Sequence, residues 1–110
     1  MAMVARRQAY ALAFASEVTK QLRVIDAKYH TLIREKIGEQ LRFRPATETT
    51  NRKPLRQPAL FEATWEIRFG PDNRFRVLYD IDHEAHVVRI MAIGEKQGER
   101  LFIGGEEVQL

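Results

Sequence analysis

The residues with the greatest capacity for chemistry in this 110-residue chain are its cations, which number 18 against 15 carboxylates. Arg68 and Arg76 alternate with apolar residues in two predicted strands, and the next strand and its exit carry Arg89, Lys96 and Arg100. Neighbouring strands lie about 4.8 Å apart, so outward-pointing cations from three strands can reach one phosphate. Guanidinium groups bind phosphate through paired hydrogen bonds and stabilise a phosphoryl transition state. The spacing predicts an anion-binding face, although ordinary surface ion pairs would leave the same pattern.

A second basic cluster lies in the sequence "NRKPLRQP" at 51–58, which holds Arg52, Lys53 and Arg56 together with two prolines. It directly precedes the predicted strands, and we interpret it as the basic rim of the same face, with an idle solvated loop as the alternative. The net charge of +3 is small, so the prediction depends on clustering rather than on total charge.

Other kinds of site find little support in the sequence. The chain has no cysteine, which excludes thiol catalysis and disulfides and is typical of a reducing cytoplasm. It has no serine-nucleophile motif and no glycine-rich phosphate loop. Acidic residues and histidines crowd together in "DIDHEAH" at 80–86, but their spacing matches no known metal site, and a solvated hairpin tip is expected. We therefore expect no metal and no cofactor. We also expect no membrane span, because a span needs a run of about 18 apolar residues.

Hydrophobic periodicity predicts the first elements that must position the cations. After a frayed basic leader at 1–8, Tyr10, Leu12 and Phe14 alternate with alanines in "YALAFA", which predicts a strand at 10–15 buried on both faces. Ser16 is the expected cap of a short helix. A longer helix at 27–43, preceded by Asp26 as a second cap, has apolar residues at three- and four-residue steps.

The second half of the chain has the pattern of strands. After a long irregular connection at 46–64, the segments "TWEIRF", "RFRVLYDID" and "VVRIMAI" are predicted as antiparallel strands, followed by a last strand or hairpin around 104–105. Arg68 and Arg76 should point away from the faces that carry Trp65 and Phe75. The sequence does not decide whether Trp65 and Phe69 face the helices or the solvent, because a register shift of one residue would exchange the two faces. The predicted fold class is a single α+β domain over 1–110, with two N-terminal helices packed on an antiparallel sheet of about four strands whose other face is partly open.

These segments together resemble a known family. The series "WEIRFG", "FRVLYDID" and "VVRIMAIGEK", after helices ending near "REKIGEQL" and a basic "NRKPLR" segment, is similar to the RelE/ParE superfamily of type II toxin–antitoxin toxins over roughly residues 9–102. The resemblance implies a small basic α+β fold. Many members cleave mRNA in the ribosomal A site without a metal, whereas another branch poisons DNA gyrase; both kinds are neutralised by an antitoxin.

The resemblance also implies roles for particular residues. Arg76 matches the arginine of the family's "Y-R-L-V-Y"-like strand and would clamp the scissile phosphate, with Lys96 and Arg68 assisting the clamp or donating a proton. The reaction would be attack of a ribose 2′-OH on the neighbouring phosphate. Phe102 lies at about the position where ribosome-dependent nucleases commonly carry tyrosine or histidine; it can stack on a base but cannot transfer a proton.

Glu66 or Glu95 could replace that missing group as the general base. The expected nucleic-acid-binding surface comprises Arg52, Lys53, Arg56, Arg89, Arg100 and Phe102.

The resemblance leads us to expect a cytoplasmic toxin that inhibits translation as a metal-independent, ribosome-associated mRNA endoribonuclease. The alternatives are a non-catalytic toxin that poisons DNA gyrase and an inactive anion-binding member of the fold. The expected partners are mRNA and the ribosome, or gyrase in the alternative, and an antitoxin whose acidic, partly disordered segment covers the sheet and the basic rim.

Overall fold

The computed structural model describes residues 8–56 and 60–109, so most of the predicted basic leader lies outside it. Its two α-helices are α1 (Val18–Arg23) and α2 (His30–Leu41), and short 3-10 turns occur at Ala27–Tyr29, Leu60–Glu62 and Pro71–Asn73. The strands are β1 (Ala11–Phe14), β2 (Arg52–Pro54), β3 (Trp65–Phe69), β4 (Phe75–Asp82), β5 (Val87–Gln97), β6 (Arg100–Ile103) and β7 (Glu106–Val108). No helix in the described ranges is long and apolar enough to cross a membrane.

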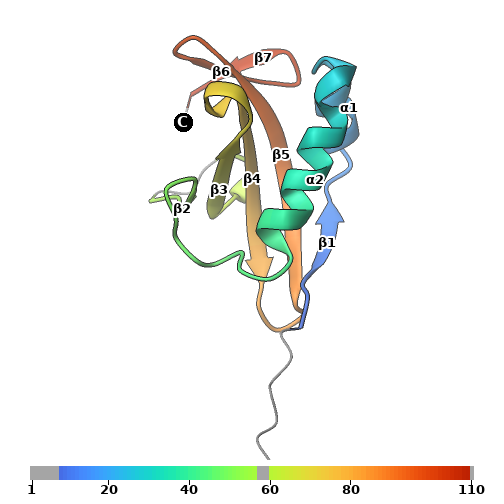
Figure 1. Cartoon of the computed structure of the whole chain (residues 1–110), viewed down its shortest axis with the longest axis vertical. Coiled ribbons are helices and arrows are strands. Elements are labelled where there is room, and N and C mark those ends of the chain that lie inside the picture. Colours follow the sequence, from blue (N-terminus) through green and yellow to red (C-terminus); the bar gives the residue numbers. More distant parts are fainter. Residues whose placement is uncertain (1–7, 57–59, 110) are drawn as a thin grey trace, which may run out of the picture.

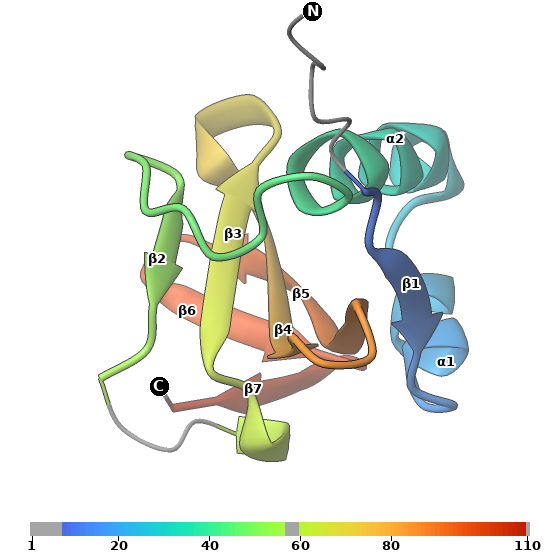
Figure 2. The same cartoon turned by 90° about the horizontal axis from the view of Figure 1, so that it is seen from below.

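The strands form one mixed sheet around the long strand β5 (Figures 1 and 2). The order β2-β3-β4-β5-β6-β7 is antiparallel throughout. β1 pairs in parallel with the first part of β5, and β6 pairs with its last part. The α+β class is therefore confirmed, but the prediction of about four antiparallel strands is corrected to seven strands with one parallel pair, and α2 is the one main helix.

β1 differs from the prediction of a strand buried on both faces. It lies at an edge of the sheet beside α1, whereas β2 lies at the opposite edge (Figure 2). Its burial pattern is mostly exposed, and Phe14 is 53% exposed. Alternation with alanine predicted the extended backbone correctly. It did not reveal that the strand lies at an edge of the sheet, where it pairs with β5 alone among the described strands.

The two predicted helix caps have different outcomes. Asp26 is confirmed, since its carboxylate accepts a hydrogen bond of 3.0 Å from the Lys28 backbone N–H. Ser16 is wrong as the cap of α1: Glu17 occupies the capping position, and no side chain caps that helix.

The main core lies between the helices and one face of the sheet. Ile33, Ile37 and Leu41 of α2 are buried against a large apolar cluster from β3, β4 and β5. Phe69 and Phe75 belong to that cluster, so β3 and β4 turn their aromatic faces to the helices, an orientation that the sequence left undecided. We call the opposite side of the sheet the open face; it carries Glu66, Arg68, Arg76 and Lys96.

A β-bulge divides β5 into two parts with different orientations. Tyr79 is opposite Ile90, but Leu78 is opposite Ala92, so Met91 is an extra residue in β5. Beyond the bulge, Ala92 and Lys96 therefore point to the open face rather than towards the helices. Between the segments that pair with β1 and β6, the buried side chain of Gln21 accepts a hydrogen bond of 2.9 Å from the Ile93 N–H. This contact satisfies a backbone group that no strand pairs.

The open face has a smaller core of its own at one end. It consists of Ala63, Leu78, Ala92, Leu101 and Ile103, with Leu55, Met91 and Val108 packed against it. Leu55, in the connection after β2, packs against this cluster, and Val108 of β7 extends it within the sheet as the neighbour of Leu101. Charged residues make up other parts of the face.

Two glycines test this packing in opposite directions. A Cβ added to Gly38 in α2 would lie 3.6 Å from Arg42 Nε, an ordinary contact, so Gly38→Ala should raise the free energy of unfolding by about 0.5–1 kcal/mol. A Cβ added to Gly94 would lie 2.9 Å from Ile103 Cγ1 and 3.0 Å from the Phe102 carbonyl oxygen, which is too close. Gly94→Ala should therefore lower the free energy of unfolding by about 1–3 kcal/mol. Urea denaturation of both variants measures the changes in the free energy of unfolding. Changes of the same sign in the two variants would contradict this packing.

Tyr79 predicts a loss of stability in alkaline solution. Its hydroxyl is buried and donates a 2.6 Å hydrogen bond to the Pro45 carbonyl. Burial raises the pKa of Tyr79 well above its usual range, and the charge of Arg52 opposes this only in part. The resulting stabilisation is present below a pH of about 10, where an unfolded tyrosine begins to ionise, and is lost as the pH rises further. Urea denaturation between neutral and alkaline pH should show the free energy of unfolding falling in the wild type and falling less in Tyr79→Phe. An equal fall in both proteins would contradict this role of Tyr79.

Candidate anion-binding site

Two arginines face each other on adjacent strands of the open face. β3 and β4 place Arg68 directly opposite Arg76 in the antiparallel ladder. The Cβ atoms of such a pair lie about 5 Å apart, and like charges in this position destabilise a sheet. The arrangement lowers stability in the free protein and favours any anion that binds between or beside the two guanidinium groups.

Arg76 has fewer of its hydrogen-bond donors engaged than Arg68 among the described residues. Burial lowers the pKa of Arg76, the charge of Arg68 lowers it further, and the charge of Glu66 partly opposes both effects. The guanidinium remains protonated at neutral pH because the ordinary pKa of arginine is so high. Its Nε is buried and has no hydrogen-bond partner within residues 8–56 and 60–109. Arg76 therefore has a charge and a donor that the described part of the protein leaves available.

Glu66 is buried beside these arginines, with only 4% of its surface exposed. Its Oε1 accepts a hydrogen bond from Arg68 Nε at 3.0 Å and lies 2.8 Å from a terminal nitrogen of the same guanidinium. Its Oε2 is buried and finds no hydrogen-bond partner among the described residues. One oxygen of this carboxylate is thus held by Arg68, and the other is not engaged.

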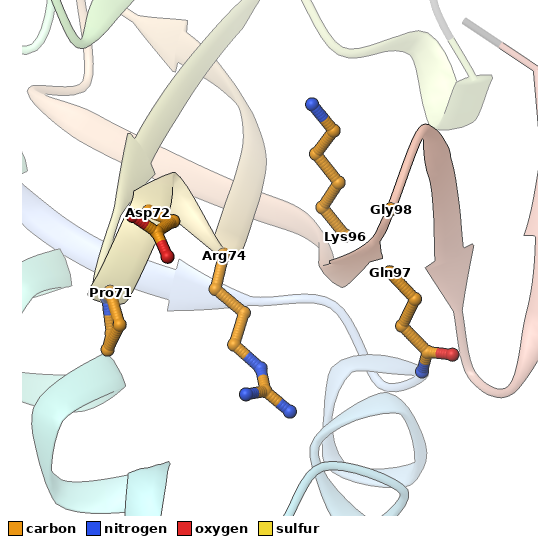
Figure 3. A pocket seen from close by; sticks show the side chains of 6 residues that line it. All are labelled: Pro71, Asp72, Arg74, Lys96, Gln97 and Gly98. Atoms are coloured by element: carbon orange, nitrogen blue, oxygen red, sulfur yellow. The ribbon is translucent and has the colours of Figure 1, made fainter.

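Lys96 completes the group of cations from a third strand. Gly94 lies opposite Arg76, and Lys96 follows two residues later on the same side of β5. Figure 3 shows the Lys96 side chain extending away from those of Arg74 and Gln97. These residues, together with Pro71, Asp72 and Gly98, line an open pocket of about 530 Å³ at the end of the sheet. The three residues predicted to be catalytic, Arg68, Arg76 and Lys96, therefore lie on one face of three adjacent strands, and of these Lys96 also lines the pocket.

Glu95 lies on the opposite side from this group. It is opposite Phe75, which belongs to the core under the helices, and its carboxylate forms an ion pair with Arg74. The hydrogen bond with Glu95 raises the pKa of Arg74, an effect that desolvation partly offsets. The guanidinium of Arg74 lies over the Tyr29 ring at 4.9 Å and so connects the sheet to the helices. Of the two glutamates predicted as possible bases, only Glu66 is on the face of Arg76.

Sequence reasoning missed Arg74. Its backbone carbonyl accepts a 2.7 Å hydrogen bond from the Lys96 N–H, so it helps to fix the backbone that carries this lysine. Arg74 is the first residue of the predicted strand "RFRVLYDID", where alternation would put it on the same face as Arg76. In the structure it ends the turn at Pro71–Asn73 with helical backbone angles, and its side chain contacts Glu95 and Tyr29 instead.

The basic cluster at 51–58 divides into a structural part and an exposed part. Arg52 is 6% exposed and donates to the Thr47 carbonyl at 3.0 Å and to the Gln40 carbonyl and side-chain oxygens at 2.9 and 2.7 Å. This burial contradicts the expectation that Arg52 contacts nucleic acid. Lys53 is exposed opposite Glu66, and Arg56 is exposed after β2. The cluster contains a short edge strand rather than a loop alone, and its last residues, 57–58, lie outside the described ranges.

Three other predicted nucleic-acid-binding residues lie apart from the cationic group. Arg89 forms ion pairs with Asp80 at 3.5 Å and Asp82 at 3.1 Å, about 20 Å along β5 from Lys96. Arg100 is exposed at the turn between β5 and β6, where it lies 3.8 Å from Glu107. Arg89 and Arg100 therefore do not lie beside Arg76 and Lys96, whereas the sequence predicted that these cations converge on one phosphate.

Phe102 also departs from its predicted place. It is opposite Glu95, so it points to the side of the helices, where it lines a pocket of about 180 Å³ with Gln21, Val24 and Gly104. It therefore cannot stack on a base held at Arg76. The bulge in β5 is the physical reason, because it exchanges the faces to which the residues after Met91 point.

The histidines at the tip of the hairpin between β4 and β5 take part in local packing. The Tyr10 ring stacks on His86 at 3.9 Å, and His83 Nδ1 is 3.5 Å from the Tyr10 hydroxyl. Within the ranges that the structure describes, no group of three or more His, Asp or Glu residues is placed to hold a metal ion.

The fold and the site together define a small α+β protein whose mixed sheet carries cations on the face opposite its helices. No family model and no curated protein matches the sequence. Among solved structures, a chain in the crystal structure of the toxin–antitoxin complex RelBE2 from Mycobacterium tuberculosis is similar, with a TM-score of 0.65 and 23% sequence identity. The match covers 83% of this chain and 95% of that one. The resemblance seen in the sequence is thus confirmed at the level of the fold.

The buried position of Arg52 can be tested against its exposed neighbour. Arg52→Met removes three hydrogen bonds and leaves the oxygens of Gln40 and Thr47 without a donor, so it should lower the free energy of unfolding by at least about 2 kcal/mol. Lys53→Met removes the same charge from an exposed position and should change stability by no more than about 0.5 kcal/mol. Denaturant unfolding measures both, and equal effects would contradict the structural role of Arg52.

Proposed function

We propose that this protein is the toxin component of a type II toxin–antitoxin system and inhibits translation by metal-independent cleavage of mRNA on the ribosome. The observation that carries this proposal is the cross-strand pair of Arg68 and Arg76 with Lys96 on the same face. The similarity in fold to a chain of a toxin–antitoxin complex supports it.

The cations suit the chemistry of phosphodiester cleavage. When a ribose 2′-OH attacks the adjacent phosphate, negative charge accumulates on the phosphoryl oxygens. Arg76, half-buried and with an unpartnered donor, would bind those oxygens, and Arg68 would add a second charge beside it. Lys96 would donate a proton to the departing 5′ oxygen. Removing one such donor from an enzyme commonly lowers the rate by about 10²–10³-fold.

The same surface suits an antitoxin. The open face combines cations with a small apolar cluster, and the rim residues Lys53 and Arg56 are exposed beside it. An acidic, partly disordered segment with apolar side chains would satisfy both features on binding. We therefore propose that a cognate antitoxin covers this face in the cytoplasm and that mRNA reaches it only after the antitoxin is removed.

A second candidate function, the poisoning of DNA gyrase without catalysis, is favoured by one observation. Phe102 points to the helix side, and β6 places neither tyrosine nor histidine on the open face. A toxin without those groups would bind its target and inhibit it without cleavage. A supercoiling assay of purified gyrase with the purified protein distinguishes the two functions.

Arg76→Ala should abolish toxicity while leaving the protein folded. The experiment is induction in bacteria with pulse-labelling of new protein and new DNA during the first minutes. Arg89→Ala is the matched control, because it removes the same charge from a residue that is paired with Asp80 and Asp82 at the far end of the sheet. We expect protein synthesis to stop first with the wild type and with Arg89→Ala, and to continue with Arg76→Ala.

The other outcomes are also informative. Continued toxicity of Arg76→Ala would show that the site has been assigned wrongly. An earlier stop of DNA synthesis would replace the nuclease function with the gyrase function. Thermal unfolding of the purified Arg76→Ala protein establishes that any loss of toxicity does not come from misfolding.

A further inference from the structure

Two short turns of the sheet share a left-handed backbone at successive residues but differ in residue type. In the turn before β4, Asp72 and Asn73 have φ angles of 52° and 53°. In the turn before β3, Phe61 and Glu62 have φ angles of 64° and 61°. Aspartate and asparagine tolerate this conformation, whereas steric contact disfavours it for phenylalanine and glutamate. The conformation of the turn before β3 therefore does not explain why Phe61 is there.

The apolar core does not explain Phe61 either. Its side chain is 43% exposed, although aromatic side chains usually stabilise a fold through burial. Ala63, which follows the turn, is the neighbour that is buried in the apolar cluster of the open face. An exposed aromatic residue on a strained backbone is the kind of feature that binding sites retain.

Hydrogen bonds just beyond the turn hold it in place at the start of β3 (Figure 2). The Thr64 N–H donates to the Tyr79 carbonyl at 3.0 Å, and its hydroxyl donates to an Asp80 carboxylate oxygen at 2.7 Å. Its carbonyl accepts a 2.9 Å hydrogen bond from the Leu55 N–H. Because the backbone after Phe61 is already fixed, binding through this ring requires little further ordering.

The turn adjoins the cations of the open face. Ala63 belongs to one apolar cluster with Leu78, and Leu78 follows Arg76 by two residues on the same face of β4. Two residues of a strand span about 7 Å, so the turn is within reach of the nucleotides next to a phosphate bound at Arg76.

We infer that Phe61 is a base-stacking residue that binds an unpaired base of a nucleotide close to the phosphate at Arg76. The ligand class is single-stranded nucleic acid. This inference rests on the proposed function and adds to it a residue that influences which sequences are bound. Every nucleobase has a π face, so all bases can stack, and the larger rings of purines give them a modest advantage.

The surroundings of Phe61 favour a nucleotide as the occupant. Arg76 has a donor that no described residue engages. Lys53 and Arg56 are exposed in and after β2, the strand that pairs with β3. Aromatic rings combined with cations that follow a phosphate backbone are a common means of binding single strands. The ring and the cations together fit a ligand that offers a flat base and a phosphate.

Stacking can be measured separately from cleavage. Ribosomes are loaded with a short synthetic mRNA whose A-site codon consists of 2′-deoxynucleotides, which lack the attacking hydroxyl. The fluorescent base 2-aminopurine, whose emission depends on its stacking partners, replaces each base of the codon in turn. We expect the wild type to change the fluorescence at a single codon position. Phe61→Leu should abolish this change, and Phe61→Tyr should retain it.

Cleavage of the all-ribose mRNA should follow the same order. Removing one base–aromatic contact commonly weakens binding by about 5–100-fold, so Phe61→Leu should lower kcat/KM by about this factor and remove the preference for a purine. Phe43→Leu is the matched control, because Phe43 is 51% exposed and lies beyond the end of α2. This control should retain both the fluorescence change and cleavage.

A stability measurement separates stacking from a structural role of Phe61. Asparagine tolerates positive φ, so Phe61→Asn should relieve strain and melt at a temperature equal to or above that of the wild type. The same variant should lose the fluorescence change. Stability and binding would then move independently, which a loss of packing does not produce. A lower melting temperature together with lost binding would overturn the inference.

The failures of the two hypotheses can be distinguished. If the wild type cleaves mRNA and Phe61→Leu matches it in cleavage and fluorescence, base stacking is overturned and the proposed function stands. That result would assign Phe61 to a protein partner instead. If the wild type shows the Phe61-dependent fluorescence change but cleaves no mRNA, the proposed cleavage is overturned and base stacking stands. If it shows neither, both are overturned.

Discussion

The single extra residue in β5, Met91, determines which side chains the open face displays. With strict alternation, Lys96 would share the face of Val88 and Ile90 and would point into the core under the helices. The bulge rotates the strand so that Lys96 joins Arg68 and Arg76, while Glu95 turns to Arg74 on the helix side. A bulge thus separates two functions of one strand: its first part builds the core, and its last part builds the cationic site.

The two faces of the sheet use the same pair of residue types for different purposes. On the helix side, Glu95 and Arg74 form an ion pair that is completed by the Tyr29 ring and fixes the backbone next to Lys96. On the open face, Glu66 contacts Arg68 through one oxygen only, and Arg76 lies beside this pair with a donor that no described residue engages. The pair of Glu95 and Arg74 has its charges matched within the protein and stabilises the fold. The second is incomplete, and that is the electrostatic condition under which a phosphate can bind with a gain in free energy.

The sequence predicted the parts of the fold whose periodicity is strong. Trp65 to Phe69 and Phe75 to Asp82 alternate clearly, so it could be predicted that Arg68 and Arg76 point away from the aromatic faces of β3 and β4. Which face packs on the helices could not, because a register shift of one residue exchanges the two faces. The run "VVRIMAI" is apolar almost throughout and contains neither glycine nor proline, so nothing in it marked the bulge.

The misplacement of Phe102 follows from the missed bulge, whereas that of Arg52 has a different cause. Arg52 is buried by contacts with Gln40 at the end of α2, and the composition of the irregular connection between the two residues does not show that it folds back and brings them together. The parallel pairing of β1 with β5, likewise, joins Ala11 to Val87 near opposite ends of the chain. Contacts of such sequence separation close a large loop and form late in folding. During synthesis, β1 emerges well before its partner strand β5, and Lys96 is part of that partner strand. A nascent fragment that ends before β5 can therefore carry the hairpin of β3 and β4 but not the complete cationic site, so the site is assembled only after β5 has been synthesised.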